Sequence, residues 1–223
     1  RYLFIIFFVA IALFLSIPIY FDYSKREEII KFYLQENYNL RIKNIEQIVF
    51  KSLPVPHLSI KNSYINFYTE KINFKTQNLI IYPELFSIYN YKNFHVKKIK
   101  LQNINTEVDY ENFNIIIDKI LNSKKKINLT GLNIILKNLN EKIIEIKRIN
   151  FSNYGYKKNI IIGEIFQKKF KLKLNDNLSN INFKILETGI SSIININKEG
   201  TSYIGDTKGK VLNSNYKFNF KYY

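Results

Sequence analysis

An uncharged apolar stretch near the N-terminus constrains this chain more than any other feature. It runs from Tyr2 to Phe21 (YLFIIFFVAIALFLSIPIYF) and contains no charged residue. A helix of this length reaches roughly 30 Å, the thickness of the hydrocarbon core of a bilayer. Tyr20 and Tyr23 lie near its end, where amphipathic rings favour the headgroup layer. We therefore expect a transmembrane anchor over residues 1–22.

Two other interpretations of this stretch fit less well. A buried core helix would need helical partners, and little of the later sequence has helical periodicity. A cleaved signal peptide would have a shorter apolar region that ends in a small-residue cleavage site. Here the apolar run continues into SIPIYFDYSK without such a site. The sequence favours a single uncleaved membrane anchor.

The composition indicates a folded and strongly basic protein. The chain starts at Arg1 and has no Met, so we expect it to be a piece of a longer product. Its formal net charge is +16, which is typical of surfaces that bind nucleic acid or anionic lipid. The lysines are scattered, however, and no RNA-binding aromatic motif, zinc-ligand spacing or helix-turn-helix pattern accompanies them. We expect no nucleic-acid partner, and attraction to anionic headgroups remains open.

The segment after the anchor has the pattern of a short amphipathic helix, expected over residues 23–38. Its apolar residues recur at helical spacing within 25–37, and the segment NYN at residues 37–39 ends the pattern. Ser24 and Glu27 have the spacing of a capping box, so we expect Ser24 to cap the helix.

Residues 39–223 have the alternating pattern of β-strands. In KKFKLKLN, Phe170, Leu172 and Leu174 alternate with lysines and must share one face of a strand. Similar runs recur around Phe183 and Phe218, separated by turn signals at residues 153–156, 175–177, 198–200 and 206–209. Pro54 and Pro56 belong at the start or the edge of a strand, because proline cannot donate a ladder hydrogen bond. We expect a mainly β domain with a long, curved antiparallel sheet, interrupted by short helices near 83–90 and 112–121.

No arrangement of side chains suggests catalysis. His57 and His95 are the only histidines and have no cysteine or carboxylate at metal-ligand spacing. The sequence has no nucleophile elbow, phosphate-binding loop or dinucleotide fingerprint. We therefore expect a protein that is not an enzyme and has no cofactor or metal.

The order of these features resembles the N-terminal region of the AsmA family. Two degenerate apolar motifs carry the resemblance, one over Ser52–Phe67 (SLPVPHLSIKNSYINF) and one over Leu79–Ile115. The matching positions are Leu53, Pro54, Pro56, Leu58, Ile60 and Asn62 in the first motif, and Leu79, Pro83, Leu85, Phe86, Phe94, Val96, Ile99, Leu101 and Val108 in the second. The chain departs from the family at Asn90 and at residues 111–114, where the family has glycine and tryptophan.

The resemblance implies a single-pass protein of the Gram-negative inner membrane with its N-terminus in the cytoplasm and its bulk in the periplasm. Such proteins are implicated in outer-membrane assembly and lipid homeostasis, and their larger relatives are similar to bridge-like lipid-transfer proteins. The sheet is then expected to continue past Tyr223.

The apolar strand faces are the candidate site under this interpretation. A strongly curved sheet can leave an apolar groove that membrane lipids fill with their acyl chains. The candidate groove residues are Val96, Ile99, Leu101, Ile134, Leu136, Phe170, Leu172, Leu174, Phe183, Ile185, Phe218 and Phe220. The same alternation also fits a closed core, in which case the protein would be a structural or assembly factor that contacts other envelope proteins.

Overall fold

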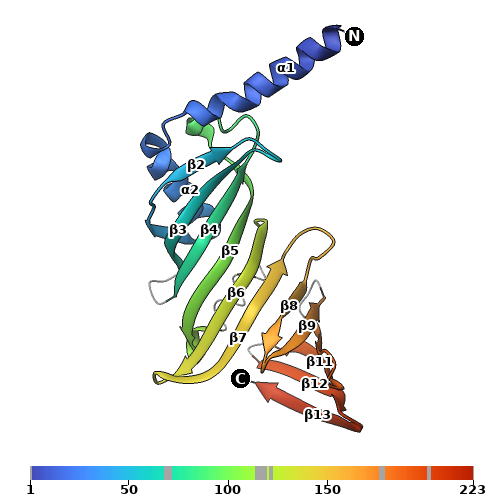
Figure 1. Ribbon diagram of the computed structural model, residues 1–223. Coiled ribbons are helices and arrows are strands. Elements are labelled where there is room, and N and C mark those ends of the chain that lie inside the picture. Colours follow the sequence, from blue (N-terminus) through green and yellow to red (C-terminus); the bar gives the residue numbers. More distant parts are fainter. Residues whose placement is uncertain are drawn as a thin grey trace. The chain divides into compact units, whose positions relative to one another are not determined.

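The computed structural model describes residues 2–67, 72–113, 120, 123–175, 179–199 and 202–222. Over these residues the chain is mainly β, with 13 strands that pair almost entirely antiparallel and one long apolar helix (Figure 1). This confirms the fold class expected from the alternating patterns. The chain divides into two compact units, residues 1–107 with 123–127, and residues 108–122 with 128–223. The alternation in the sequence does not mark this division.

Unit 1 holds the helices and the first strands. In chain order they are α1 (Tyr2–Ser16), η1 (Ile17–Tyr20), η2 (Ser24–Arg26), α2 (Glu27–Tyr38), β1 (Leu40–Asn44), β2 (Ile48–Lys51), β3 (His57–Phe67), β4 (Asn73–Pro83), η3 (Tyr91–Asn93) and β5 (Val96–Asp109), whose last two residues belong to unit 2. The sheet order is β1-β3-β4-β5, and β2 pairs with β3.

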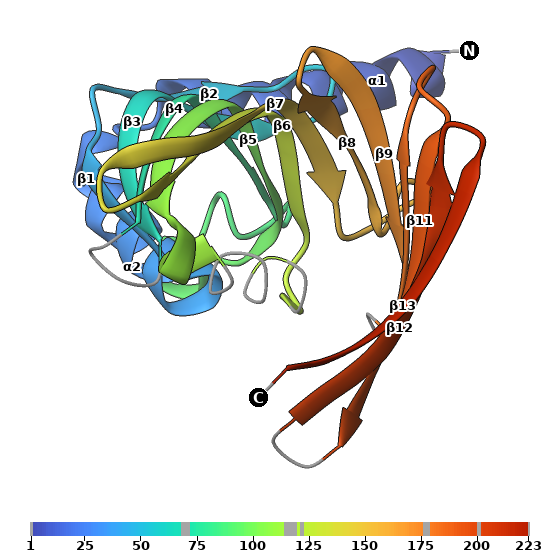
Figure 2. The ribbon, with the colours of Figure 1, turned by 90° about the horizontal axis from the view of Figure 1, so that it is seen from below.

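Unit 2 is an antiparallel meander in which each strand pairs with the next (Figure 2). Its strands are β6 (Ile127–Asn138), whose first residue belongs to unit 1, β7 (Glu141–Ser152), β8 (Ile160–Ile165), β9 (Lys168–Leu174), β10 (Asn180–Ile185), β11 (Ile190–Glu199), β12 (Ser202–Val211) and β13 (Ser214–Tyr222).

The N-terminal helix has the properties of a membrane span. Residues Tyr2–Tyr20 form 19 continuous helical residues with a mean hydropathy of 2.7 over the most apolar window. None of the α1 residues is buried in the protein. An apolar helix of this length with no buried residue is typical of a single-pass anchor.

Helix α2 begins differently from the prediction. Its N-cap is Arg26, which makes no side-chain capping bond, so the predicted capping box is wrong. Ser24 instead donates its hydroxyl to the carboxylate of Asp22. The end of the helix is as expected, because Asn39 takes the left-handed conformation with φ 54° and donates its backbone N–H to Gln35.

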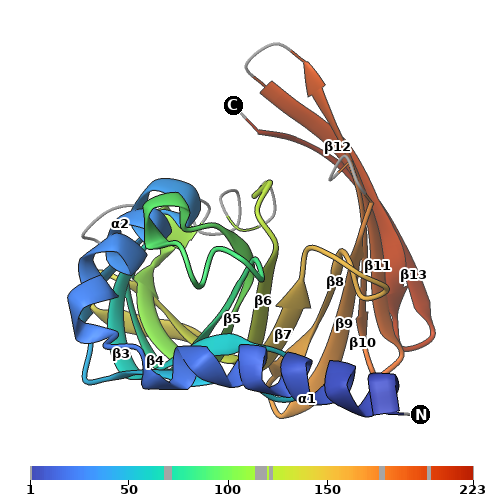
Figure 3. The same ribbon diagram turned by 90° about the horizontal axis from the view of Figure 1, so that it is seen from above.

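The core of unit 1 is closed by α2. Ile30 and Leu34 of this helix are fully buried, and α2 packs against β1 at one side of the β1-β3-β4-β5 group (Figure 3). Tyr33 of α2 reaches β5 at the other side, where its hydroxyl accepts the Val96 N–H at 3.2 Å. A helix that contacts both the first and the last strand of this group requires the strands to curve around it.

A row of irregular residues bends these strands. Asn62 on β3 and Asn103 on β5 have φ angles of 46° and 51°, and Gln77 of β4 lies between them in the register. Asn103 donates its side-chain amide to Gln77 at 2.8 Å. The inward-facing positions shift by one residue at this row, so that Ile60 is followed by Ser63 in β3.

The connections at one end of the sheet differ in part from expectation. Pro54 and Pro56 lie in the connection just before β3, which begins at His57, and the Leu53–Pro54 bond is cis. The short helix predicted near 83–90 is wrong, because β4 includes Pro83 and residues 85–89 are turns. Of the helix predicted near 112–121, residues 110–113 and Ile120 are helical, and the rest lies outside the described residues.

The turn predicted at 206–209 is also wrong. Strand β12 passes straight through this segment, and the chain reverses after Val211 instead. Gly205 and Gly209 leave room for both neighbouring strands, because a Cβ at these positions would collide with the Asn195 and Ser191 backbone carbonyls of β11 and with the Phe220 and Tyr216 side chains of β13, respectively. Of the other predicted turns, residues 153–156 lie in a turn, while those at 175–177 and 198–200 fall partly outside the described residues.

Candidate functional site

A continuous apolar face crosses the strands of unit 2. Directly opposite residues of antiparallel strands share a face. Phe151 lies opposite Ile161, Ile161 opposite Leu172, and Leu172 opposite Phe183. Strands β7 to β10 therefore place their apolar side chains on the same side of the sheet.

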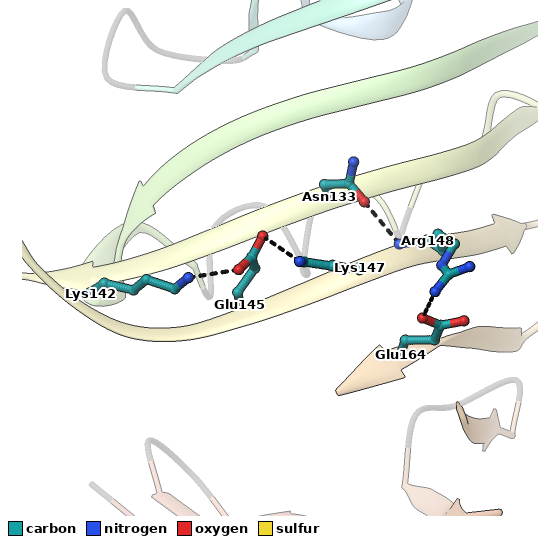
Figure 4. Close-up of polar contacts among 6 residues, drawn as sticks. All are labelled: Asn133, Lys142, Glu145, Lys147, Arg148 and Glu164. Atoms are coloured by element: carbon teal, nitrogen blue, oxygen red, sulfur yellow. Dashed lines mark hydrogen bonds and ion pairs between the residues drawn. The ribbon is translucent and has the colours of Figure 1, made fainter. Parts of the chain in front are cut away.

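Irregularities in β6 and β7 keep the apolar residues on this face. Gly131 and Arg148 have positive φ angles of 67° and 52°, at points where the register between the strands shifts. Arg148 donates its backbone N–H to the Asn133 side chain at 2.9 Å, which satisfies the irregular backbone (Figure 4). Because of the shift, Ile149 faces the same way as Ile146 although it is three residues away.

The apolar face holds a cavity of about 210 Å³. Its lining consists entirely of aliphatic and aromatic side chains: Phe113, Ile120, Leu129, Leu132, Ile134, Ile146, Ile149, Phe151, Ile161, Ile165, Phe170, Leu172 and Phe183. No polar side chain of the described residues lines it, so a ligand would find no directional hydrogen bond there. Apolar cavities of about 150 Å³ stay dry and take up small hydrocarbons.

Gly163 determines where the Phe170 ring lies in the wall of this cavity. It lies opposite Phe170, and a Cβ at position 163 would lie 2.8 Å from the Phe170 ring and 3.2 Å from Ile149. The missing side chain allows the ring to lie over β8. Phe170 in turn contacts Phe183 across β9 and β10, with 5.9 Å between ring centroids.

The apolar face continues beyond the cavity but loses its cover. Phe170 is the last apolar residue in the sequence that is buried, considering only the residues the structure describes. Phe218 on β13 lies opposite Thr207, which lies opposite Ile194, so all three residues are on this face. Nevertheless, 57% of the surface of Phe218 is exposed. Ser192 and Thr207 interrupt the apolar surface and bond to each other at 2.9 Å.

The opposite face of the same strands is polar and basic. Lys171 lies opposite Lys184, and Lys208 lies opposite Lys217. On β7 one carboxylate partly neutralises the positive charge of two lysines, because Glu145 forms ion pairs with Lys142 at 2.6 Å and Lys147 at 3.3 Å (Figure 4). The hydrogen bond from the Lys142 ammonium lowers the pKa of Glu145, and the hydrogen bond from Lys147 lowers it further to a smaller extent.

The structure separates the expected groove residues into two groups. Val96, Ile99 and Leu101 are buried in the core of unit 1, within strand β5. The other nine lie on the apolar strand faces of unit 2, where they change from buried to open along the strand order: Ile134, Leu136 and Phe170 are buried, Leu172, Leu174, Phe183, Ile185 and Phe220 are half-buried, and Phe218 is exposed. Among these nine, Ile134, Phe170, Leu172 and Phe183 line the cavity.

Several cavity residues did not belong to the predicted set. Ile149, Phe151 and Ile161 line the cavity, although strict alternation does not assign them to one face. The irregular residues Gly131 and Arg148 shift the strand register, so that these three side chains lie on the same face. Gly131 and the asparagines beside those positions, such as Asn133 and Asn150, are a sequence signal for this shift.

The histidines lie outside this site. His57 places Nδ1 2.7 Å from the Val55 carbonyl, and His95 places Nδ1 2.9 Å from the Asn93 carbonyl. Within the described residues, no group of three or more His, Cys, Asp or Glu side chains could hold a metal ion.

The fold and site define a class: a β protein with one apolar N-terminal helix and an apolar strand face that is only partly covered. Comparison with family models, curated proteins and solved structures gives no match. The chemistry of the apolar face therefore carries the functional argument.

Proposed function

We propose that this protein is an AsmA-like, single-pass protein of the Gram-negative inner membrane that holds phospholipid acyl chains on the apolar face of unit 2. Its β region would lie in the periplasm and serve outer-membrane assembly and lipid homeostasis. The observation that carries the proposal is the apolar cavity together with the partly exposed face that continues from it across β11–β13.

The physical chemistry of this face suits a hydrocarbon ligand. Each methylene group that leaves water contributes about 0.8 kcal/mol, so a chain of many methylenes binds well without any polar contact. The cavity of about 210 Å³ offers contacts of this kind, because its lining among the described residues is aliphatic and aromatic. An exposed Phe218 on the same face would extend the contact along the strands.

The half-buried state of Leu172 favours this proposal over a closed core. A closed core leaves residues at the centre of its apolar face inaccessible, as Ile99 is in unit 1. Leu172 keeps part of its surface accessible although it lines the cavity. An acyl chain would cover this surface, and no catalytic group or cofactor is needed for that role.

Photo-crosslinking at two adjacent positions tests the proposal. Leu172 and Lys173 point to opposite faces of β9 because successive side chains of a strand alternate. A photoreactive amino acid at Leu172 should form adducts with phospholipid in membranes, identified by mass spectrometry, whereas the same group at Lys173 should not. Adducts at Lys173 alone, or at neither position, would contradict acyl-chain binding and favour an assembly factor that contacts envelope proteins.

The variant Leu172→Asn gives a second measurement. If the face is open, the new amide keeps contact with water, so lipid binding should fall while the melting temperature changes little. If the face is a closed core, the buried amide should cost about 1–3 kcal/mol beyond the lost apolar burial. A sharp drop in stability without any lipid bound to the unmodified protein would contradict the proposal.

A further inference from the structure

The loop between β4 and β5 lies directly against the apolar N-terminal helix. The ring of Tyr89 stacks on Phe14 at 4.5 Å between centroids, and its hydroxyl donates to the Phe14 carbonyl. Phe86 of the same loop lies 6.4 Å from Phe14, also measured between ring centroids. All three residues belong to unit 1, so their arrangement is defined within one compact unit.

The tip of this loop exposes large apolar side chains. Phe86 is 75% exposed and Leu85 is 46% exposed, while Ser87 and Ile88 behind them are buried. Ser87 fixes the base of the loop, because its hydroxyl oxygen lies 2.9 Å from both the Glu84 and the His95 carbonyl oxygens and its single hydrogen is shared between them. The loop therefore presents Leu85 and Phe86 outward from a hydrogen-bonded base.

The neighbouring connection at this end of the sheet has the same character. The β2–β3 connection lies at the same end of the sheet as the end of β4. Lys51 at the end of β2 pairs with His57 at the start of β3, and the His57 ring lies 5.5 Å from the ring of Tyr82 near the end of β4. Between β2 and β3, Leu53 is 75% exposed and Val55 is 52% exposed. Figure 1 shows both connections at the end of the β2–β5 strands from which α1 leaves.

The depth of Phe14 follows from its distance to the C-terminal end of the apolar helix. The helix ends at Tyr20, and the first charged residue after it is Asp22. Phe14 lies about 9 Å inside this end, within the hydrocarbon layer of a helix that spans the bilayer. A ring in contact with Phe14 must enter the same leaflet.

We propose that the β4–β5 loop is a second membrane contact, in which Leu85 and Phe86 insert beside α1 into the leaflet that faces the β domain. The partner that covers this apolar tip is the lipid bilayer itself. Two attachment points, the anchor and the loop, fix the orientation of unit 1 on the membrane, which a single helix followed by a flexible joint would leave free. This contact does not depend on any ligand in unit 2.

Tryptophan fluorescence of the full chain in lipid vesicles tests the inference. The sequence has no Trp, so each Phe86→Trp, Tyr64→Trp or Phe7→Trp variant carries a single tryptophan. Phe7 belongs to the anchor, and Tyr64 on β3 is 46% exposed at a distance from these connections. Quenching by lipids brominated in the acyl chain reports insertion, and quenching by aqueous iodide reports exposure to water.

The expected result is that bromolipid quenches Phe86→Trp and Phe7→Trp strongly, and that iodide quenches only Tyr64→Trp. Iodide quenching of Phe86→Trp equal to that of Tyr64→Trp, with Phe7→Trp still quenched by bromolipid, would overturn the inference. The absence of bromolipid quenching in Phe7→Trp would overturn it too, because the loop inserts beside an embedded anchor. Far-ultraviolet circular dichroism identical to that of the unmodified chain confirms that each variant is folded.

Discussion

The ring of Phe170 lies over Gly163 on the neighbouring strand, so closely that a Cβ on Gly163 would lie 2.8 Å from the ring. A glycine in a strand interior ordinarily weakens the strand, and here its absent side chain makes room for an aromatic ring. The same relationship recurs where Gly205 meets Phe220 and Gly209 meets Tyr216. Aromatic rings that cover glycines on an adjacent strand are thus a repeated device of this sheet.

The variant Gly163→Ala should therefore destabilise unit 2 by about 2 kcal/mol, since inserting a methyl group into a packed site forces neighbours to move. The Phe170 ring would shift into the cavity and reduce acyl-chain binding. Chemical denaturation measures the first effect. In a Phe170→Leu background the same change should cost much less, and an equal cost in both backgrounds would contradict the proposed ring contact.

Alkaline pH should destabilise unit 1. Burial raises the pKa of Tyr91 to about 12 from an ordinary value near 10.0, and burial also raises the pKa of Tyr23. These phenols ionise at a lower pH in the unfolded chain than in the folded one. Their burial therefore costs no stability below pH 10, and the free energy of unfolding falls as the pH rises toward 12. Thermal melting over this range should show a decline that Tyr91→Phe reduces.

Tyr156 provides the matched control for this titration. It is 91% exposed, so Tyr156→Phe should leave the alkaline decline unchanged. If Tyr156→Phe and Tyr91→Phe had equal effects on the decline, burial of Tyr91 would not be its cause.

The histidines should be dispensable for lipid binding. His57 and His95 each contact a backbone carbonyl two residues earlier in the chain, and neither lines the cavity. We expect the double variant His57→Gln and His95→Gln to keep the acyl-chain crosslinks of the unmodified protein. A loss of crosslinks in a double variant that still melts normally would reveal a role for one of these side chains.

The orientation in the membrane can be tested with a single cysteine. The chain has no Cys, so Tyr156→Cys at an exposed position supplies the only thiol. If the β region is periplasmic, a maleimide that crosses the outer but not the inner membrane should label intact cells. Labelling only after the inner membrane is broken would place the β region in the cytoplasm instead.

The sequence predicted the fold class well because alternation depends on local chemistry. Lysines that alternate with Phe170, Leu172 and Leu174 leave only one arrangement for β9. Asn39 likewise ended α2 as expected, because asparagine tolerates the left-handed conformation.

Several of the errors arose where a distant residue decided the local structure. Gly209 looked like part of a turn, but its partner Tyr216 keeps it within a strand. Residues after Pro83 looked helical, but contacts of Phe86 and Tyr89 with Phe14 hold them in a non-helical loop. The cavity could not be predicted in full because Gly131 and Arg148 change the alternation of β6 and β7. Such compensating shifts depend on pairing between strands and leave little trace in either strand alone.

The nearest-neighbour pairing of β6–β13 also bears on how proteins of this architecture can change in length. Among the described residues, each strand from β7 to β12 pairs only with the strand before it and the strand after it, as the units of a solenoid do. Insertion or deletion of one whole hairpin would move the later strands along the array and leave every other pairing intact. The apolar face would grow or shrink by two strands and keep its direction, since strands added in pairs preserve the alternation. Evolution can therefore adjust the reach of such a sheet in discrete steps, without redesigning the strands already present.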